Sequence, residues 1–458
     1  MTAADVLPRP TPGPSREYRF PALERLTLSS GLRVVVAPVS KLPIATVIAL
    51  VDAGASADPH GQEGVALLAA RALAEGTERH DGAELAARFE RLGTALDASA
   101  DWDSATLRIT VTSERLPAAL MLLAEVIREP SFPAREVERL RQERLAELLQ
   151  QRAEPRGLAD DMFSRFAYAP ESRYALPDGG VERTVDTLSQ GAVRAFYDER
   201  YTPSSTTVIV VGDTTVEHAT QMVADAFGSW AGGSVRHVTV SDQPAATTRL
   251  VHVVGKADAP QSEVRVGHVG VPRLHPDYFS IVVMNAILGG LFSSRINLNL
   301  REAHAYTYGA FSSFDWRKAA GPFTVATAVR SDVTDAAVRE ILFEIDKLRE
   351  GGVTDAELTL ATSYLDGVFP IRFESTTAIA TALASLVSYG LPDDYFDTYR
   401  FQVRSVTADQ VLAAARAHLR PDELQVVAVG DPTIIRAPLE ALGAGPVLVY
   451  DAEGHPTS

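Results

Sequence analysis

Apolar residues follow two different periods along this chain, and the period changes at regular places. The stretches GLRVVVAPV (31–39) and ATVIALVDAG (45–54) are rich in β-branched residues and are bounded by turn formers, which predicts strands. Apolar residues three and four positions apart predict amphipathic helices in GVALLAARALAEG (64–76), ELAARFERLG (84–93) and AREVERLRQERLAELLQQRAE (134–154). The chain is therefore predicted to begin with strands and to continue with a block of helices.

Two distant segments share one layout. LSQGAVRAFYDERYTPSSTTVIVVGDTT (188–215) and VTADQVLAAARAHLRPDELQVVAVGDPT (406–433) each contain a Ser or Thr helix start, an amphipathic helix, a proline turn and a β-branched strand that ends in Gly-Asp. The matching landmarks lie at a constant offset of 218 residues: Val193 and Val411, Pro203 and Pro421, Gly212-Asp213 and Gly430-Asp431. A constant offset through several landmarks indicates an internal repeat.

The repeat extends upstream. LGTALDASADWDSATLRITV (92–111) and YGAFSSFDWRKAAGPFTVATAV (308–329) both predict two strands around a short turn, and SEVRVGHVGV (262–271) reopens the strand pattern. Strands followed by helices predict the α+β class: two homologous halves, each a mostly antiparallel sheet covered on one face by helices. The predicted boundaries are an N-terminal arm at 1–22, a first half at 23–229, a linker at 230–249 and a second half at 250–458.

Composition narrows the class of partner. The 458 residues carry a formal net charge of −16, which disfavours nucleic acids and anionic membranes because both need a basic surface. There are no cysteines, which excludes disulfides and thiolate metal sites. No apolar run is long enough for a membrane span, and the Pro-rich start has no apolar leader core. We expect a cytoplasmic protein as the chain stands, and a periplasmic or secreted one if a leader was removed.

Common catalytic signatures are absent. No nucleophile elbow, phosphate loop or dinucleotide fingerprint occurs, and none of the ten histidines forms the i, i+4 pair that binds zinc on a helix. The acidic positions of 134–154 alternate with arginines and predict a solvated helix face: Glu136, Glu138, Glu143 and Glu147. Arg301 and Tyr308 remain as candidates for chemistry. Taken alone, the spacing fits equally a surface arginine and a tyrosine that packs at the rim of a sheet.

A known family supplies the context of that pair. LGGLFSSRINLNLREAHAYTYGAFSSF (288–314) closely resembles a segment of the pitrilysin-type zinc metallopeptidases, the inverzincins. FESTTAIATALASLVSYGLPDDYFDTY (373–399) and the segment 406–431 are similar to the same family. The resemblance covers residues 24–450 and includes both halves of the repeat.

The resemblance also shows what this sequence lacks. The family carries H-x-x-E-H on a helix of the first half, with two histidines and a later glutamate as zinc ligands and the first glutamate as general base. In the frame GVALLAARALAEGT (64–77) the ligand positions fall on Leu67 and Arg71, and the base position falls on Ala70. The third ligand falls at or beside Glu147. We expect no metal on this chain, and an ion pair between Arg71 and Glu147 in its place.

In some members of the family two homologous chains share one active site. One chain holds H-x-x-E-H, and the other lacks it but contributes an arginine and a tyrosine. The resemblance implies that Arg301 binds a substrate carbonyl or carboxylate and that Tyr308 donates to the developing oxyanion. Strand alternation would place His304, Tyr306 and Tyr308 on one face, so Tyr306 is a candidate for lining the same cleft, with simple sheet packing as the alternative.

The function predicted from the sequence is the non-metal subunit of a heterodimeric zinc peptidase, with zinc on a homologous partner and a peptide as substrate. The alternative is a catalytically silent assembly protein, like the core subunits of the respiratory cytochrome c reductase. A scaffold has no need of both Arg301 and Tyr308, which favours the first. An independent hydrolase with unrecognised catalytic residues is the third hypothesis.

Overall fold

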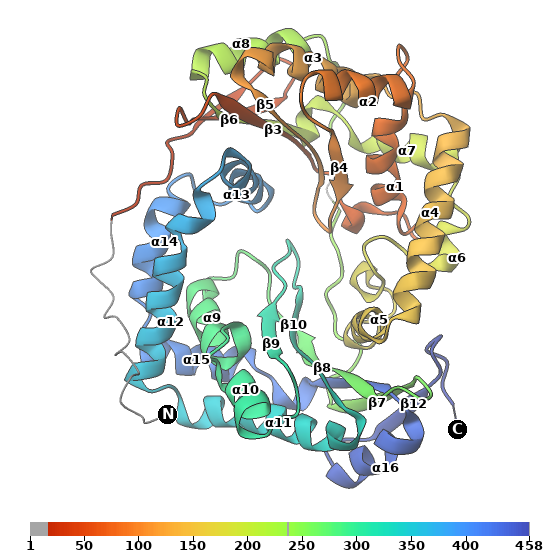
Figure 1. The fold of residues 1–458 in the computed structure, drawn as a ribbon, viewed down its shortest axis with the longest axis vertical. Helices are drawn as coiled ribbons and strands as arrows, with labels where there is room; N and C mark the ends of the chain where they lie inside the picture. Colours follow the sequence, from red (N-terminus) through yellow and green to blue (C-terminus); the bar gives the residue numbers. More distant parts are fainter. Residues whose placement is uncertain (1–16, 236–237, 458) are drawn as a thin grey trace, which may run out of the picture.

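The computed structural model describes residues 17–235 and 238–457 and contains two six-stranded sheets (Figure 1). The first sheet has the order β1-β2-β6-β3-β5-β4. Only β2 and β6 pair in parallel, so this sheet is mostly antiparallel. Its strands are β1 (Glu24–Thr27), β2 (Arg33–Pro38), β3 (Ile44–Val51), β4 (Asp97–Ala100), β5 (Ala105–Thr112) and β6 (Thr206–Gly212).

The second sheet repeats this plan in the order β12-β7-β11-β8-β10-β9. Its strands are β7 (Leu250–Gly255), β8 (Gln261–Val269), β9 (Ala310–Phe314), β10 (Pro322–Arg330), β11 (Gln425–Gly430) and β12 (Val447–Tyr450). One edge differs: β1 runs antiparallel to β2, whereas β12 comes from the end of the chain and runs parallel to β7. The predicted α+β class with two similar halves is confirmed.

The helices of the first half follow the predicted periodicity. They are α1 (Val65–Ala72), α2 (Gly82–Arg91), α3 (Leu116–Arg128), α4 (Ala134–Ala153), α5 (Pro155–Ala167), α6 (Glu182–Val185), α7 (Gln190–Arg200) and α8 (Val216–Phe227). Apolar side chains from α1, α3, α7 and α8 form one core with Val34, Val36, Val47 and Val208 of the first sheet. These helices therefore cover one face of that sheet.

The second half contains α9 (Tyr278–Asn285), α10 (Arg295–Asn297), α11 (Thr334–Gly351), α12 (Asp355–Val368), α13 (Thr376–Ser388), α14 (Tyr395–Arg404), α15 (Ala408–His418) and α16 (Pro432–Leu442). Two π-helical turns, Ala286–Gly290 and Leu298–Ala303, flank α10. The matching helices α7 and α15 have the same length, and each begins after a hydroxyl side chain, Ser189 or Thr407, that caps the helix.

The second face of the first sheet is covered by a helix of the other half. Val35, Ile48 and Ile209 point away from the first core and join the core of the second half. Helix α13 packs against β3 and β6 on this face (Figure 1). At the contact, the hydroxyls of Thr46 and Thr376 lie 2.9 Å apart, and both side chains are buried.

The reverse exchange covers the second sheet. Helix α5 of the first half packs against β8 and β11, and its Leu158 and Phe163 form a core with Val427 and Val429. The sequence predicted helices on one face of each sheet. The structure adds one exchanged helix on the other face, because the central strands are apolar on both sides.

The start of the described chain is anchored rather than loose. Phe20 is buried and stacks on Phe396 with ring centroids 4.4 Å apart, and it meets Phe373 edge-on at 5.1 Å. Tyr18 contacts the ring of Phe369 at 6.0 Å. These contacts tie residues 17–22 of the predicted arm to the second half, while residues 1–16 lie outside the described residues.

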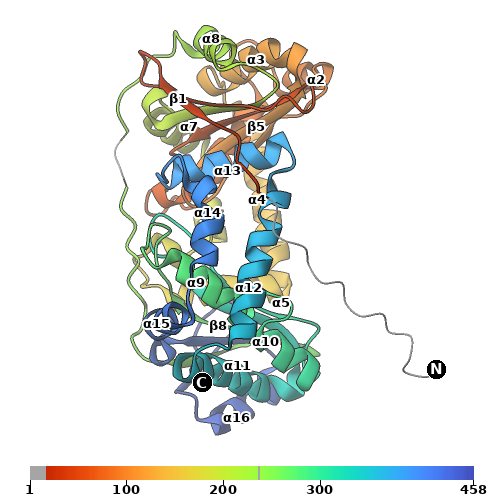
Figure 2. The same ribbon diagram turned by 90° about the vertical axis from the view of Figure 1, so that its left-hand side faces the viewer.

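The connection between the halves runs along the outside of the molecule from α8 (Figure 2). Its described residues, 231–235 and 238–249, form no helix or strand. Backbone hydrogen bonds hold it against the end of α5: the Ala169 N–H donates to the Gln243 carbonyl at 2.9 Å, and the Ala245 N–H donates to the Ala167 carbonyl at 3.0 Å.

One described helical segment, Tyr278–Ala303, is long and apolar enough to cross a membrane. More than half of its most apolar window (56%) is buried inside the molecule. Ile281, Met284, Ile287 and Leu300 of this segment belong to the core of the second half, so we assign the segment to that core.

The contacts of Phe20 with Phe373 and Phe396 predict that Phe20→Ala destabilises the molecule. Removing a buried aromatic ring costs about 3 kcal/mol of unfolding free energy. Chemical denaturation monitored by circular dichroism measures this loss. Phe401→Ala is the matched control, because Phe401 is 63% exposed and its truncation should change stability by less than about 0.5 kcal/mol. Equal losses in both variants would contradict the anchoring role of Phe20.

Candidate functional site

The carboxylate of Asp58 and the backbone of Gly64 fix the start of helix α1. The carboxylate of Asp58 accepts hydrogen bonds from the Gly64 N–H at 2.7 Å and the Ala66 N–H at 2.9 Å, and it pairs with Arg173 at 2.8 Å. Burial raises the pKa of Asp58 to about 6, against the opposing effect of Arg173 and the two amides. Gly64 adopts a φ of 103°, and a Cβ here would lie 2.8 Å from the Gly179 carbonyl oxygen. Only glycine fits this start.

The positions that the resemblance assigns to zinc lie on α1 and α4. Leu67 and Arg71 are one turn apart and partly exposed on the same side of α1, and Ala70 is fully buried. The Arg71 Nη1 lies 2.9 Å from Glu147 Oε1 on α4. The predicted ion pair between Arg71 and Glu147 is present.

A second arginine completes this pair. Arg144 donates from Nη1 to Glu147 Oε2 at 3.0 Å and from Nε to the Gly179 carbonyl at 3.0 Å. Partial burial alone would raise the pKa of Glu147, but hydrogen bonds and charge from Arg71 and Arg144 outweigh it, so the pKa lies below its ordinary value. The carboxylate is thus ionised and fully engaged.

These residues do not fit a zinc ion. Zinc needs histidine, carboxylate or thiolate ligands, and a leucine side chain offers no lone pair. The two guanidinium groups around Glu147 would repel a cation. A water-activating base is also absent at Ala70, whose side chain lies in the apolar core.

The remaining acidic residues of α4 form the predicted solvated face. Arg139 bonds Glu136 at 2.7 Å and Glu143 at 2.6 Å, and Arg141 bonds Glu138 at 2.8 Å. These pairs at three- and four-residue spacing contribute a few tenths of a kcal/mol each to the helix. Glu147 is therefore the one member of the predicted set whose partner lies on α1.

Arg301 lies in the π-helical turn Leu298–Ala303, close to the edge strand β9. Its Cζ is 4.4 Å from the ring centroid of Phe292, and its Nε is 3.5 Å from Glu302. The buried Nη1 has no hydrogen-bond partner among the described residues. The side chain as a whole is 34% exposed, so its other donors can reach an acceptor from outside the chain.

The turn after Arg301 ends the helix with a left-handed (αL) cap. The Ala305 N–H donates to the Arg301 carbonyl at 3.2 Å, and the Tyr306 N–H donates to the Leu300 carbonyl at 2.8 Å. Ala305 takes the left-handed conformation with a φ of 54°, where glycine is usual. This motif sets the direction in which the chain leaves the helix and approaches β9.

The predicted alternation of His304, Tyr306 and Tyr308 is wrong, because residues 304–309 form a loop and β9 begins at Ala310. The rings of His304 and Tyr306 stack at 5.0 Å, and Tyr306 packs against the core of the second half. Tyr308 points outward and is 93% exposed. Tyr306 thus follows the packing alternative, while Tyr308 stands alone beside the edge strand.

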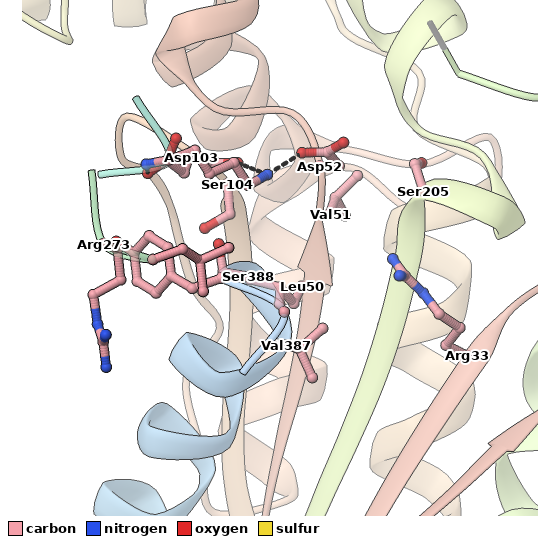
Figure 3. A pocket seen from close by; sticks show the side chains of 14 residues that line it. Arg33, Leu50, Val51, Asp52, Asp103, Ser104, Ser205, Arg273, Val387 and Ser388 are labelled. Atoms are coloured by element: carbon pink, nitrogen blue, oxygen red, sulfur yellow. Dashed lines mark hydrogen bonds and ion pairs between the residues drawn. The ribbon is translucent and has the colours of Figure 1, made fainter. Parts of the chain in front are cut away.

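A cavity of about 380 Å³ between the two halves was not predicted. In Figure 3, Asp52, Asp103 and Ser104 lie along one side, and Leu50 and Val387 lie along the other. The β9–β10 turn closes it through Lys318, whose Nζ bonds Asp52 Oδ1 at 2.6 Å and whose N–H donates to Asp103 Oδ2 at 3.0 Å.

This contact joins two matching turns of the repeat, ADWDS (100–104) and FDWRK (314–318). The Arg317 guanidinium lies 4.1 Å from the centroid of Trp102. The sequence did contain a signal for this contact, because one turn carries acidic residues and the other carries basic residues. Burial raises the pKa of Asp103 to about 6, although Lys318 opposes this shift.

The fold, the α1–α4 contact and the turn that carries Arg301 and Tyr308 define a class. This is a duplicated α+β protein that retains the framework of a metallopeptidase without its metal ligands. The profile described as "Insulinase (Peptidase family M16)" matches residues 33–174, and that described as "Peptidase M16 inactive domain" matches residues 187–365. The chain belongs to peptidase family M16.

Individual relatives agree with this assignment. A crystal structure of a peptidase M16 inactive domain from Pseudomonas fluorescens is 27% identical, with a TM-score of 0.83, and the match covers 89% of this chain and 98% of that one. An uncharacterized zinc protease of Streptomyces coelicolor is 23% identical over 87% of this chain and 88% of its own length. A protein of Helicobacter pylori named as a non-peptidase homologue is 21% identical over 85% and 90%.

The ion pair of the α1–α4 contact predicts that Arg71→Ala lowers stability by about 1 kcal/mol at pH 7, more than an exposed arginine contributes. The pKa of Glu147 is lowered in the folded state, so this contribution is present above its unfolded pKa and is lost as pH falls through the folded value. Denaturation at pH 7 and at pH 3 measures the difference. Arg183→Ala on the exposed face of α6 is the control, and equal effects would argue against a structural pair.

The buried carboxyl of Asp103 predicts a pH dependence of stability that is opposite in sign to that of Glu147. Folded Asp103 keeps its proton up to about pH 6, so stability falls as pH rises from its ordinary pKa through that value. Asp103→Asn removes this charge but keeps an oxygen for the Lys318 N–H. We expect the variant to be more stable than the natural chain by about 1–2 kcal/mol at pH 8 and equally stable at pH 4. The exposed Asp225→Asn is the control, and a destabilised Asp103→Asn at pH 8 would contradict this account.

Proposed function

We propose that this chain is the non-metal subunit of a heterodimeric zinc peptidase, and that it supplies Arg301 and Tyr308 to a homologous zinc-bearing partner. The observation that carries the proposal is the state of these two side chains. Tyr308 is 93% exposed next to the edge strand β9, and the Arg301 side chain is 34% exposed and lies beside Glu302 of its own turn. Both reach solvent as hydrogen-bond donors, on a chain whose Leu67, Ala70 and Arg71 provide neither the ligands nor the base of a catalytic zinc site.

Arg301 would bind an oxygen of the substrate. The Phe292 ring over its guanidinium and the nearby Glu302 position the group, and the side chain is 34% exposed to a substrate. A charge-assisted hydrogen bond from a fixed guanidinium to a carbonyl or carboxylate is stronger than one between neutral groups. This role is one of binding, so its loss should raise KM first.

Tyr308 would act on the reacting carbonyl. Its phenol projects from the molecule and can donate to an oxygen that becomes negative as water attacks the peptide bond. The zinc and the general base would come from the partner, since Leu67, Ala70 and Arg71 provide neither. This chain would therefore be inactive alone.

The substrate class implied by this arrangement is an extended peptide. Phe311 on the edge strand β9 is 52% exposed and offers an apolar contact to such a peptide. The outer backbone groups of this strand are engaged within the chain, since the Ala310 N–H donates to Asn297 Oδ1 and Asn285 Nδ2 donates to the Ser312 carbonyl, each at 3.0 Å.

The second candidate is a catalytically silent assembly protein. The name of the Helicobacter pylori relative, a non-peptidase homologue, favours inactivity of a single chain and is compatible with both candidates. The two differ in what they require of Tyr308, because a scaffold does not need its hydroxyl group.

The test mixes the purified chain with a homologous chain that carries H-x-x-E-H and follows cleavage of a quenched fluorescent peptide. We expect no cleavage by this chain alone, cleavage by the mixture, and a loss of kcat of about 100- to 1000-fold with Tyr308→Phe in the mixture. Arg301→Ala should raise KM.

Tyr364→Phe is the control, because Tyr364 is a second exposed tyrosine, 50% exposed, and lies on α12. Complex formation is measured separately by analytical ultracentrifugation. A complex that forms with Tyr308→Phe and keeps full turnover would refute the shared site and favour the assembly role.

A further inference from the structure

Two histidines and one aspartate meet where α9 begins and α15 ends. His275 and Asp277 lie in the turn before α9, and His418 is the last residue of α15. One nitrogen of each imidazole and one carboxylate oxygen of Asp277 all lie within 4.8 Å of one another. This cluster involves neither the zinc positions of α1 and α4 nor Arg301 and Tyr308.

We propose that this cluster is a binding site for a divalent transition-metal ion of the zinc type. Imidazole nitrogens suit zinc, copper, nickel and iron, and a carboxylate adds a negative ligand. Three protein ligands leave one position of a tetrahedral shell for water.

The distances fit such an ion. Bonds of about 2.0 Å place neighbouring ligand atoms of a tetrahedral zinc site about 3.3 Å apart. His418 Nε2 lies 2.8 Å from Asp277 Oδ2, and His275 Nδ1 lies 4.0 Å from the same oxygen. The two separations lie on either side of the required one, and Asp277 is an exposed residue whose side chain can shift between them.

The cluster is organised before an ion binds. The two imidazole rings meet edge-to-face with centroids 4.8 Å apart. The Asp277 N–H donates to His275 Nδ1 at 3.2 Å, and an ion bound at Nδ1 would displace this hydrogen bond. His418 is buried and shares a hydrogen with Asp277. A metal ion would take the place of that shared proton.

The cations near the cluster are engaged elsewhere. The Arg273 guanidinium lies over the ring of Tyr278, 3.6 Å from its centroid. On the His418 side, the Arg420 N–H donates to His268 Nε2 at 3.2 Å, and its Nε donates to Glu423 at 2.7 Å.

A bound ion would link two helices. Helices α9 and α15 pack against each other, and α9 leads through residues 286–300 to Arg301. The ion would join the start of α9 to the end of α15, so we expect it to raise the melting temperature of the isolated chain.

The test uses the purified full chain without an oligohistidine tag. After exposure to Zn²⁺ and dialysis, we expect one equivalent of zinc by elemental analysis and a higher melting temperature than in the chelator-treated protein. Titration with Co²⁺ should give visible d–d absorption of a four- or five-coordinate ion. His275→Gln, Asp277→Asn and His418→Gln should each weaken zinc binding by more than roughly 100-fold, because a ligand matters more than the residues behind it.

His218→Gln on the exposed face of α8 is the control and should keep the zinc. Since His418 is buried and its replacement could unfold the chain, His275→Gln and Asp277→Asn carry the test, with circular dichroism as the check of folding. Absence of retained zinc in the natural chain, or equal zinc in the folded variants, would overturn the site.

Discussion

The exchange of α5 and α13 between the two halves is the constraint on which this structure depends. Each central sheet is apolar on both faces, and the helices of its own half cover only one of them. Helix α5 buries five apolar residues, Leu158, Ala159, Met162, Phe163 and Ala167. At about 1.5–3 kcal/mol for each large buried side chain, this single helix contributes an amount comparable with the net stability of a whole domain. Neither half is therefore a complete folding unit.

This exchange also fixes how the halves face each other. With α13 on β3 and β6, and α5 on β8 and β11, the matching turns 100–104 and 314–318 meet across the cavity. Trp102 packs under Arg317, and Lys318 bonds both Asp52 and Asp103. The duplicated sequence thus produces a contact between its own equivalent turns, in which one turn has become acidic and the other basic.

Much of the fold followed from the sequence because it depends on local patterns. Periodicity located α1, α2 and α4, and the repeat placed β6 and β11 at equivalent positions of the two sheets. The exchange of helices was missed, since the apolar stripe of a helix has the same appearance whichever sheet it covers.

The candidate sites also show that local sequence patterns do not predict tertiary contacts. The pair of Arg71 and Glu147 could be predicted because the resemblance places both residues around one small volume. The direction of Tyr308 could not, because a single left-handed residue, Ala305, ends the helix and breaks the expected alternation. The cavity at Asp103 and the cluster at His418 join residues that are far apart in the chain, and only the tertiary structure brings them together.

Charge replacement explains how the first half keeps its framework without a metal. A guanidinium from α1 supplies the positive charge that Glu147 of α4 needs, and Arg144 satisfies the second carboxylate oxygen. These bonds hold α1 and α4 together at positions where Leu67, Ala70 and Arg71 offer neither a zinc ligand nor a general base. The opposite holds at Arg301 and Tyr308, whose side chains reach solvent next to the edge strand β9. An exposed ion pair such as that of Arg301 with Glu302 contributes little to stability. The donors of Arg301 and Tyr308 can therefore serve a second molecule, and this contrast between the two halves favours the division of labour that we propose.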